Sequence, residues 1–216
     1  MKLKVNTFGI IIILFIILVG LKIYYESDVF NLRCIVSNVD GRKYCVRERR
    51  NIQKASNLLA STTDKMSSLV EYMGNKYSNR ENVNRLVENL GQRYPDRDNV
   101  KRMVENFNPT TIKETLPTSE YTAYSENKGE KLAFCLNKKK SNNENLIDPN
   151  TLSFVAFHEL AHIMTESVGH TDEFWQNFKF LLEHAVELKL YTPVDYKKEP
   201  ENYCGMDITD NPYYDL

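Results

Sequence analysis

The sequence lacks a large excess of charge of either sign. Its 216 residues include 28 basic and 29 acidic side chains, for a formal charge of −1. A protein that binds the nucleic-acid backbone through bulk electrostatics needs a basic excess, so no nucleic-acid partner is predicted. Acceptors for N-glycosylation are also absent, since the one near match, at Asn108, is followed by Pro109. Glycosylation therefore cannot be used to locate the chain.

Cysteine and histidine are both rare, with four residues of each. An even number of cysteines is compatible with two disulfides. A Cys34–Cys45 bond would close a short loop, and a Cys135–Cys204 bond would tie the C-terminal tail to the body. Four buried thiols are the alternative interpretation. The histidines are clustered, because three of the four lie within residues 158–170.

A long apolar run occupies residues 8–25, FGIIIILFIILVGLKIYY, in which Lys22 is the sole charged residue. Extended to Val5, the run reaches ~20 residues, about one bilayer span. It predicts a transmembrane anchor over residues 1–25. A cleaved signal peptide is the alternative, but the small residues of a cleavage site are missing where the run ends.

The charges around this run predict its orientation. Lys2 and Lys4 precede it, whereas Lys22 and Arg33 on the far side are diluted by acidic residues. The positive-inside rule then places the C-terminal domain in a lumen or outside the cell. The sequence thus predicts a single-pass membrane protein, with the membrane contacted through the N-terminal helix.

Beyond the apolar run we expect a juxtamembrane hairpin at residues 26–45 and one further domain at residues 46–216. In CIVSNVDGRKYC, Asp40-Gly41 is a turn between strand-forming residues. Apolar residues at helical spacing then predict a helix over residues 51–73. A repeat, RENVNRLVENL at residues 80–90 and RDNVKRMVENF at residues 97–107, predicts two short amphipathic helices.

A second hairpin is predicted in PTSEYTAYSENKGEKLAFCLN, residues 117–137. Asn127-Lys128-Gly129 supplies its turn, and Lys131–Leu136 forms the returning strand. A polar loop follows, and Asn150 or Thr151 can cap the next helix.

The stretch FHELAHIMTESVGH, residues 157–170, contains H-E-x-x-H inside a helical pattern that runs from Thr151 to about Val168. His158 and His162 are four residues apart and so project from one face of the helix, where both imidazoles can bind the same metal ion. Glu159 can reach a water on that ion and act as general base. The apolar neighbours predict a buried helix, and buried imidazoles need partners. The sequence therefore predicts one Zn²⁺ per chain.

The third ligand has several candidates. Glu166 continues the series, but eight residues correspond to ~12 Å along the helix axis from His158. His170 follows Gly169, a residue that stops helices, and a chain reversal there would return His170 to the metal. Three more candidates lie on the next predicted helix, which Thr171 can cap: Glu183, His184 and Glu187. We predict His170, because it requires one tight turn.

The segment HELAHIMTESVGHTDEFWQNFKFLL resembles the WLM and SprT-like zincin metallopeptidases. In that group H-E-x-x-H is followed by a third histidine and an aromatic-rich helix that begins H-x-x-x-F/W, here His170 and Phe174-Trp175. The helix after Cys45 is similar to the one that precedes the sheet in WLM-type domains. The resemblance covers about residues 45–216. With its anchor, the chain resembles uncharacterised membrane-anchored WLM-like proteins of large DNA viruses.

The resemblance implies an α+β fold: a zincin-like metallopeptidase core with a small antiparallel sheet, an H-E-x-x-H active-site helix and supporting helices, behind the N-terminal transmembrane helix. Residues 46–216 would be the catalytic domain, which hydrolyses peptide bonds in a protein or peptide substrate. His158, His162 and His170 would hold the zinc, and Glu159 would activate water. The family's edge strand lies beside an extended substrate, and Lys131–Leu136 is the candidate.

The sequence also departs from better-defined zincin patterns. Seven residues separate His162 from His170, unlike the metzincin spacing, and no Met-turn can be assigned. An oxyanion donor is not fixed, although Tyr203 or Tyr196 could serve.

The alternative function is a non-catalytic viral membrane or scaffold protein with a structural or vestigial zinc site. A fourth protein ligand would favour that alternative, and an open fourth position would favour an enzyme. Neither the substrate nor the oligomeric state is predicted.

Overall fold

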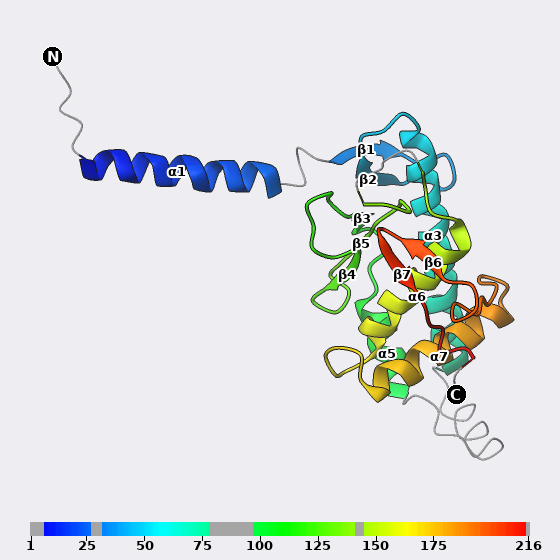
Figure 1. Ribbon diagram of the computed structural model, residues 1–216. Coiled ribbons are helices and arrows are strands. Elements are labelled where there is room, and N and C mark those ends of the chain that lie inside the picture. The colour runs from blue at the N-terminus through cyan, green and yellow to red at the C-terminus, as the bar shows by residue number, and fades with distance from the viewer. Residues whose placement is uncertain (1–6, 27–31, 78–96, 141–144, 215–216) are drawn as a thin grey trace.

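The computed structural model describes residues 7–26, 32–77, 97–140 and 145–214. Figure 1 shows one helix, α1, apart from the other described elements, which lie together. In chain order the elements are α1 (Thr7–Glu26), β1 (Leu32–Val36), β2 (Lys43–Arg47), α3 (Ile52–Tyr77), α5 (Arg97–Asn106), β3 (Ile112–Glu114), β4 (Ala123–Glu126), β5 (Lys131–Phe134), α6 (Pro149–Met164), α7 (Asp172–Glu187), β6 (Glu201–Tyr203) and β7 (Met206–Ile208).

Helix α1 contains the long apolar run, and its apolar side chains are exposed, for example Phe8 and Ile16. Across the described ranges, no helix combines the length and the apolar content that a bilayer crossing requires. The predicted transmembrane anchor at residues 1–25, and the single-pass membrane location inferred from it, are therefore wrong. A span takes ~20 consecutive, mostly apolar residues, whereas the uncharged part of α1 ends at Lys22.

The hairpin predicted at residues 34–45 is present as the antiparallel pair β1–β2, in which Cys34 faces Cys45 and is joined to it by a disulfide. Its turn is fixed by Asp40, whose carboxylate accepts hydrogen bonds from the Tyr44 hydroxyl at 2.7 Å and from the Arg42 guanidinium. Gly41 has a φ of 70°, a conformation that glycine adopts without steric cost.

The larger sheet has the order β3-β5-β4, with β4 antiparallel and β3 parallel to β5. The sheet is therefore mixed, and the prediction of an antiparallel sheet is wrong. Lys131–Leu136 is also not an edge strand, because β5 lies between β3 and β4, which are the two edge strands of this sheet. The added strand, β3, is held by Glu114, which accepts a hydrogen bond from the Arg47 backbone N–H at 2.7 Å and pairs with the buried Arg49 guanidinium.

The helices around this sheet differ from their predicted limits in detail. Helix α5 is the second copy of the repeat, and the first copy lies outside the described residues. Asp148, rather than Asn150 or Thr151, caps α6, and its carboxylate accepts both of their backbone N–H groups at 2.9 Å. Helix α6 ends at Met164 with Thr165 as its C-cap, several residues before the predicted end at Val168.

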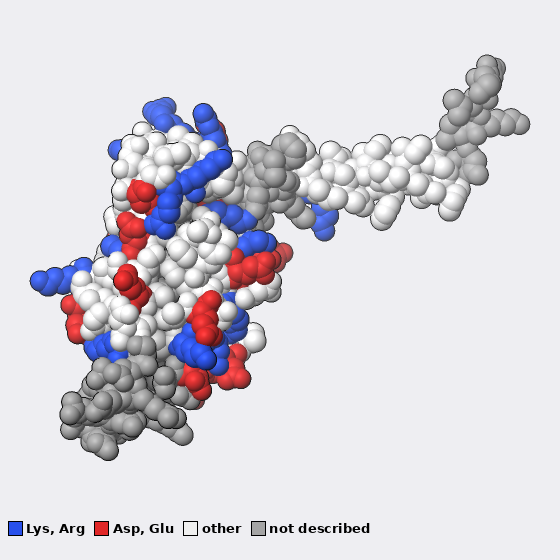
Figure 2. Space-filling model, turned by 180° about the vertical axis from the view of Figure 1, so that it is seen from behind, with Lys and Arg blue, Asp and Glu red and all other residues white. Residues whose placement is uncertain are grey.

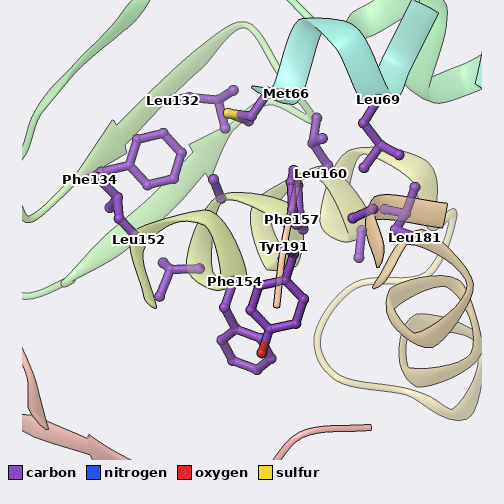
Figure 3. Packing of buried hydrophobic residues seen from close by; sticks show 14 of the residues in the cluster. Met66, Leu69, Leu132, Phe134, Leu152, Phe154, Phe157, Leu160, Leu181 and Tyr191 are labelled. Carbon is purple, nitrogen blue, oxygen red and sulfur yellow. The ribbon is translucent and has the colours of Figure 1, made fainter. Parts of the chain in front are cut away.

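Helix α6 lies at the centre of the fold and contacts α3, α5, α7 and β4. Figure 3 shows buried side chains of α6 and of the elements around it packed together: Met66 and Leu69 of α3, Leu132 and Phe134 of β5, Phe154, Phe157 and Leu160 of α6, Leu181 of α7, and Tyr191. Fully burying one such side chain stabilises the fold by about 1.5–3 kcal/mol. The H-E-x-x-H residues therefore lie on a largely buried helix that packs against four other elements of the described structure.

The C-terminal hairpin β6–β7 is fastened to the end of β5. A disulfide joins Cys135 to Cys204 across 69 residues of sequence. Next to it, the backbone N–H groups of Cys204 and Gly205 donate to the carbonyls of Asn137 and Lys138 at 3.0 and 2.9 Å. The tail that the sequence predicted to be tied to the body is thus fixed beside the sheet.

Charged side chains of both signs are interspersed over the face seen in Figure 2, while α1 is almost free of them. Exposed ion pairs of this kind include Arg42–Asp64 at 2.7 Å and Lys138–Glu201 at 2.7 Å. Isolated surface pairs contribute little to stability, about 0–1 kcal/mol each, so the buried core around α6 and the two disulfides dominate the stability of the fold.

Candidate metal centre

The three predicted ligands meet at one point. The Nε2 atom of His158 lies 3.2 Å from Nε2 of His162 and 3.1 Å from Nε2 of His170. The three residues form a group that could hold a metal ion, with their ligand atoms all within 4.8 Å of one another. Nitrogen atoms at ~2.0–2.1 Å from a tetrahedral zinc are roughly 3.3 Å apart. The spacing of the histidines therefore fits a metal ion of this size.

Two elements bring these ligands together. His158 and His162 are one turn apart on α6, so both rings point from the same face of the helix. His170 lies in the loop between α6 and α7, directly after Gly169, whose φ of 87° favours glycine. Gly169 therefore reverses the loop rather than ending the helix, but the return of His170 to the other two histidines is as predicted.

Phe174, in the first turn of α7, packs against all three ligand rings. Its ring centroid lies 4.8 Å from that of His158, 4.3 Å from that of His162 and 4.7 Å from that of His170. Phe174 is fully buried, and the ring centroid of Trp175 beside it lies 5.6 Å from that of His170, with the two rings tilted by 34°. The aromatic residues that follow the third histidine thus fix the orientation of the imidazoles.

The environment keeps the histidines on α6 neutral. Burial, followed by the charges of the neighbouring imidazoles, lowers the pKa of His158 to about 3. Burial and the charges of His170 and Lys128 lower the pKa of His162 to about 4. A neutral imidazole is the form that binds a metal ion, so near pH 7 these two side chains are ready to act as ligands.

Glu159 points into the same region from the position after the first ligand. Its side chain is only 5% exposed, and burial raises the pKa of its carboxyl to about 8. A carboxyl group with a pKa near the working pH can both accept and donate a proton. A cation close by would favour its charged form. Glu159 is therefore suited to proton transfer.

The metal ligands and Glu159 line a cavity of about 1400 Å³. Its walls come from β4 on one side, from the β6–β7 hairpin on another, and from Trp175 and Phe178 of α7. In the part of the chain that the structure describes, the ligand cluster contains three residues and no fourth. All three histidines line the cavity, so a metal ion held by them would be accessible from it.

Of the two tyrosines considered as oxyanion donors, Tyr203 lines this cavity and Tyr196 packs in the core against Phe154 at 5.0 Å. The Tyr203 hydroxyl donates a hydrogen bond to the Thr122 carbonyl at 3.3 Å. Burial, and then the charge of Glu159, raises the pKa of this hydroxyl well above its ordinary value. Tyr203 therefore stays protonated close to Glu159.

The other candidate ligands lie elsewhere. Glu166 is exposed and pairs with Arg102 at 3.2 Å. Glu187 pairs with Lys76 at 3.2 Å, and Glu183 is exposed on α7. His184 is buried, with its Nε2 atom 2.7 Å from the Tyr77 hydroxyl.

Sequence reasoning missed the residues that hold the loop between His162 and His170. The carboxylate of Glu173, in the first turn of α7, accepts the backbone N–H groups of Glu166 and Ser167 at 3.0 and 3.2 Å. Lys128 was expected to be a turn residue, but it also donates to carbonyl groups of this loop. Lys128 contacts residues that are distant in the sequence, and Glu173 contacts a loop outside its own helix. A sequence pattern local to either residue therefore does not indicate these contacts.

The position of His184 predicts a dependence of stability on pH. Burial, and then the charge of Lys76, lowers its pKa to about 4, against 6.5 in the unfolded chain. The unfolded state therefore binds more protons between these values, and the contribution of His184 to stability, complete above pH 6.5, is lost as the pH falls toward 4. We expect a loss of roughly 2–3 kcal/mol over this interval, at about 1.4 kcal/mol per pKa unit.

Urea unfolding of the wild type and of His184→Gln, in the presence of a chelator, measures this effect. Glutamine can still hydrogen-bond Tyr77 but does not titrate. All other titrating groups are shared, so the difference between the two stability curves isolates His184. Parallel curves between pH 7 and 4 would contradict the assignment of His184 as a buried neutral residue.

Comparison with known proteins reveals viral relatives. The chain is 28% identical over 177 residues to uncharacterized protein R325 of Acanthamoeba polyphaga mimivirus, covering 82% of each protein. It is 44% identical over 70 residues to uncharacterized protein 136R of Invertebrate iridescent virus 6, which covers 32% of this chain and 38% of that protein. No family model and no solved structure matches the chain. These names state no activity, so the chemistry must be argued from the site.

Proposed function

We propose that this protein is a zinc-dependent metallopeptidase. The observation that carries the proposal is the convergence of the Nε2 atoms of His158, His162 and His170 at the wall of a cavity, with the buried carboxyl of Glu159 next to the first of them. Three histidine nitrogen ligands with an open fourth position are typical of catalytic rather than structural zinc sites. A structural zinc would instead call for a fourth protein ligand, so the scaffold alternative is less well supported.

In this proposal each residue has one task. The three imidazoles would hold the zinc ion, which would supply a bound water with a pKa lowered to ~7 and a charge that polarises a substrate carbonyl. Glu159 accepts the proton of the attacking water and passes it to the leaving amine. Phe174 keeps the ligand rings in place, and Tyr203 is positioned near Glu159 as a protonated hydroxyl.

The edge strand suggests how a peptide would lie in the cavity. β4 pairs on one side with β5, and within the described sheet its other side is left without a strand. The residues of β4 line the cavity together with the metal ligands. An extended peptide could pair with this edge through its backbone, as other proteins bind peptides by adding a strand. The substrate class is therefore an extended or unfolded polypeptide segment.

The test is metal-dependent cleavage of a denatured protein mixture, with new N-termini identified by mass spectrometry. We expect the zinc-loaded protein to create new termini, a chelator to abolish them, and added Zn²⁺ but not Mg²⁺ to restore them, because nitrogen ligands favour zinc. Cleavage that persists at the same sites in the chelator would contradict a metallopeptidase. A zinc-loaded protein that creates no termini would contradict peptide hydrolysis.

A further inference from the structure

Lys128 reaches from the sheet to the metal loop. It lies in the turn between β4 and β5, and its Nζ donates to the carbonyl oxygens of His162 at 3.2 Å, Thr165 at 2.8 Å and Ser167 at 2.9 Å. An ammonium group has three N–H donors, so these contacts use all of them. One side chain thus connects the second ligand, the end of α6 and the loop that leads to His170.

These carbonyls need a partner at this point of the chain. The last four C=O groups of an α-helix have no N–H partner within the helix, and the C-terminus of the helix carries a partial negative charge. Thr165 ends α6 in an extended conformation, with ψ at 135°, so the following residues turn away from the helix axis. The Lys128 ammonium donates hydrogen bonds to these carbonyls and also places a positive charge at the C-terminus of α6, where the loop begins.

The opposite side of the loop is held by an acid. Glu173 of α7 accepts the N–H groups of Glu166 and Ser167, and the Ser167 hydroxyl at 2.8 Å. The loop is therefore clamped between the Lys128 cation and the Glu173 anion. Arg102 of α5 adds a hydrogen bond to the Met164 carbonyl at 2.9 Å. Glu173 and Arg102 are also the charged groups that act on Lys128.

The turn that carries Lys128 is itself fixed. Asn127 and Lys128 have φ values of 48° and 56°, and Gly129 has a φ of 116°. A Cβ atom at Gly129 would lie 2.5 Å from the carbonyl oxygen of Asn106, so the turn is pressed against the end of α5. Because this turn is held in place, a shift of its backbone cannot bring another side chain to the position of the Lys128 ammonium.

We propose that Lys128 is a positioning residue for the third metal ligand, His170. This inference rests on the metal site proposed above. Lys128 and Glu173 set the course of the loop between His162 and His170, so His170 is placed before any metal binds. The affinity for zinc then depends on a residue that does not contact the ion.

The test is zinc affinity, measured by competition with a chromogenic chelator, for the wild type, Lys128→Met and a matched control, Lys131→Met. Lys131 is also a lysine at the cavity wall in the same hairpin, but it pairs with Glu126 at 3.2 Å on the exposed surface. We expect Lys128→Met to weaken zinc binding roughly ten- to hundredfold, as changes in groups that orient metal ligands do. Lys131→Met should bind like the wild type.

A double variant separates positioning from a general effect on folding. In the His170→Ala background, Lys128→Met should cause no further loss of zinc affinity, because the ligand that it positions is already missing. An equal loss in both backgrounds, or no loss in either, overturns the proposal. If Lys128→Met does not fold, Lys128→Gln, which retains two N–H donors, is measured in the same way and should show a smaller loss. A wild type that binds no zinc would instead overturn the metal site itself.

Discussion

Replacing Glu159 with glutamine is expected to abolish peptide cleavage while the protein still binds one zinc ion per chain. Glutamine has the shape of the carboxyl group but cannot accept the proton of a water molecule. General acid–base catalysis contributes roughly 10²–10⁴-fold to a rate, so cleavage should fall by at least that factor. The three histidines are unchanged, and the zinc affinity should therefore be close to that of the wild type. Comparing the termini created by the two proteins measures the loss.

The folded state of the variant can be verified without activity. In the metal-free protein, burial raises the pKa of Glu159 to about 8, above its ordinary value of 4.5. The folded state thus holds an extra proton between these values, and this contribution to stability, complete below pH 4.5, is lost as the pH rises through 8. Glu159→Gln should lack that loss in urea unfolding with a chelator. Identical cleavage by the two zinc-loaded proteins would exclude Glu159 as the catalytic base.

The parts of the site that the sequence predicts correctly depend on short-range geometry. His158 and His162 share a helix face because four residues make about one turn, whatever the rest of the fold does. The N-cap at Thr171 is equally local, since the following acidic and aromatic residues mark the start of α7. Both features follow from spacing and capping, which a single sequence displays directly.

The parts that failed depend on partners distant in the sequence. Nothing near Ile112–Glu114 indicates that this segment pairs in parallel with β5, because the pairing is stabilised by contacts of Glu114 with Arg47 and Arg49. That strand makes the sheet mixed and pairs with the second side of β5, which leaves β3 and β4 as the two edge strands. The prediction for α1 failed differently: the length and apolar content of the run were taken as a membrane span, although the described helix does not meet the requirements for one.

The position of the third ligand, His170, depends both on a local sequence signal and on contacts that the sequence does not display. Gly169 indicates a reversal of the chain, but the direction of the reversal is set by Lys128, Glu173 and the Phe174 ring. Sequence reasoning favours His170 over Glu166 because Glu166 would lie ~12 Å along the helix axis from His158, whereas His170 needs one tight turn. In the structure the two residues are distinguished by position: His170 faces the other ligands, and Glu166 faces solvent beside Arg102.

Zinc binding is therefore expected to depend on His170 and not on Glu166. His170→Ala removes one of three protein ligands, and because changes that only orient a ligand cost 10–100-fold, the loss in affinity should exceed ~100-fold. Glu166→Ala is the matched control, since it removes a residue of the same loop whose side chain is 81% exposed. Its zinc affinity should equal that of the wild type.

The fluorescence of Trp175 provides a direct signal for the zinc-binding experiment. Trp175 is the single tryptophan of the sequence, and its ring lies 5.6 Å from that of His170. A metal ion held by His170 should change its fluorescence in the wild type and in Glu166→Ala, with a stoichiometry of one. In His170→Ala the change should require a far higher zinc concentration. Unchanged affinity in His170→Ala together with a loss in Glu166→Ala would reverse the assignment, and the proposed role of Lys128 would fail with it, because the loop would then position a different ligand.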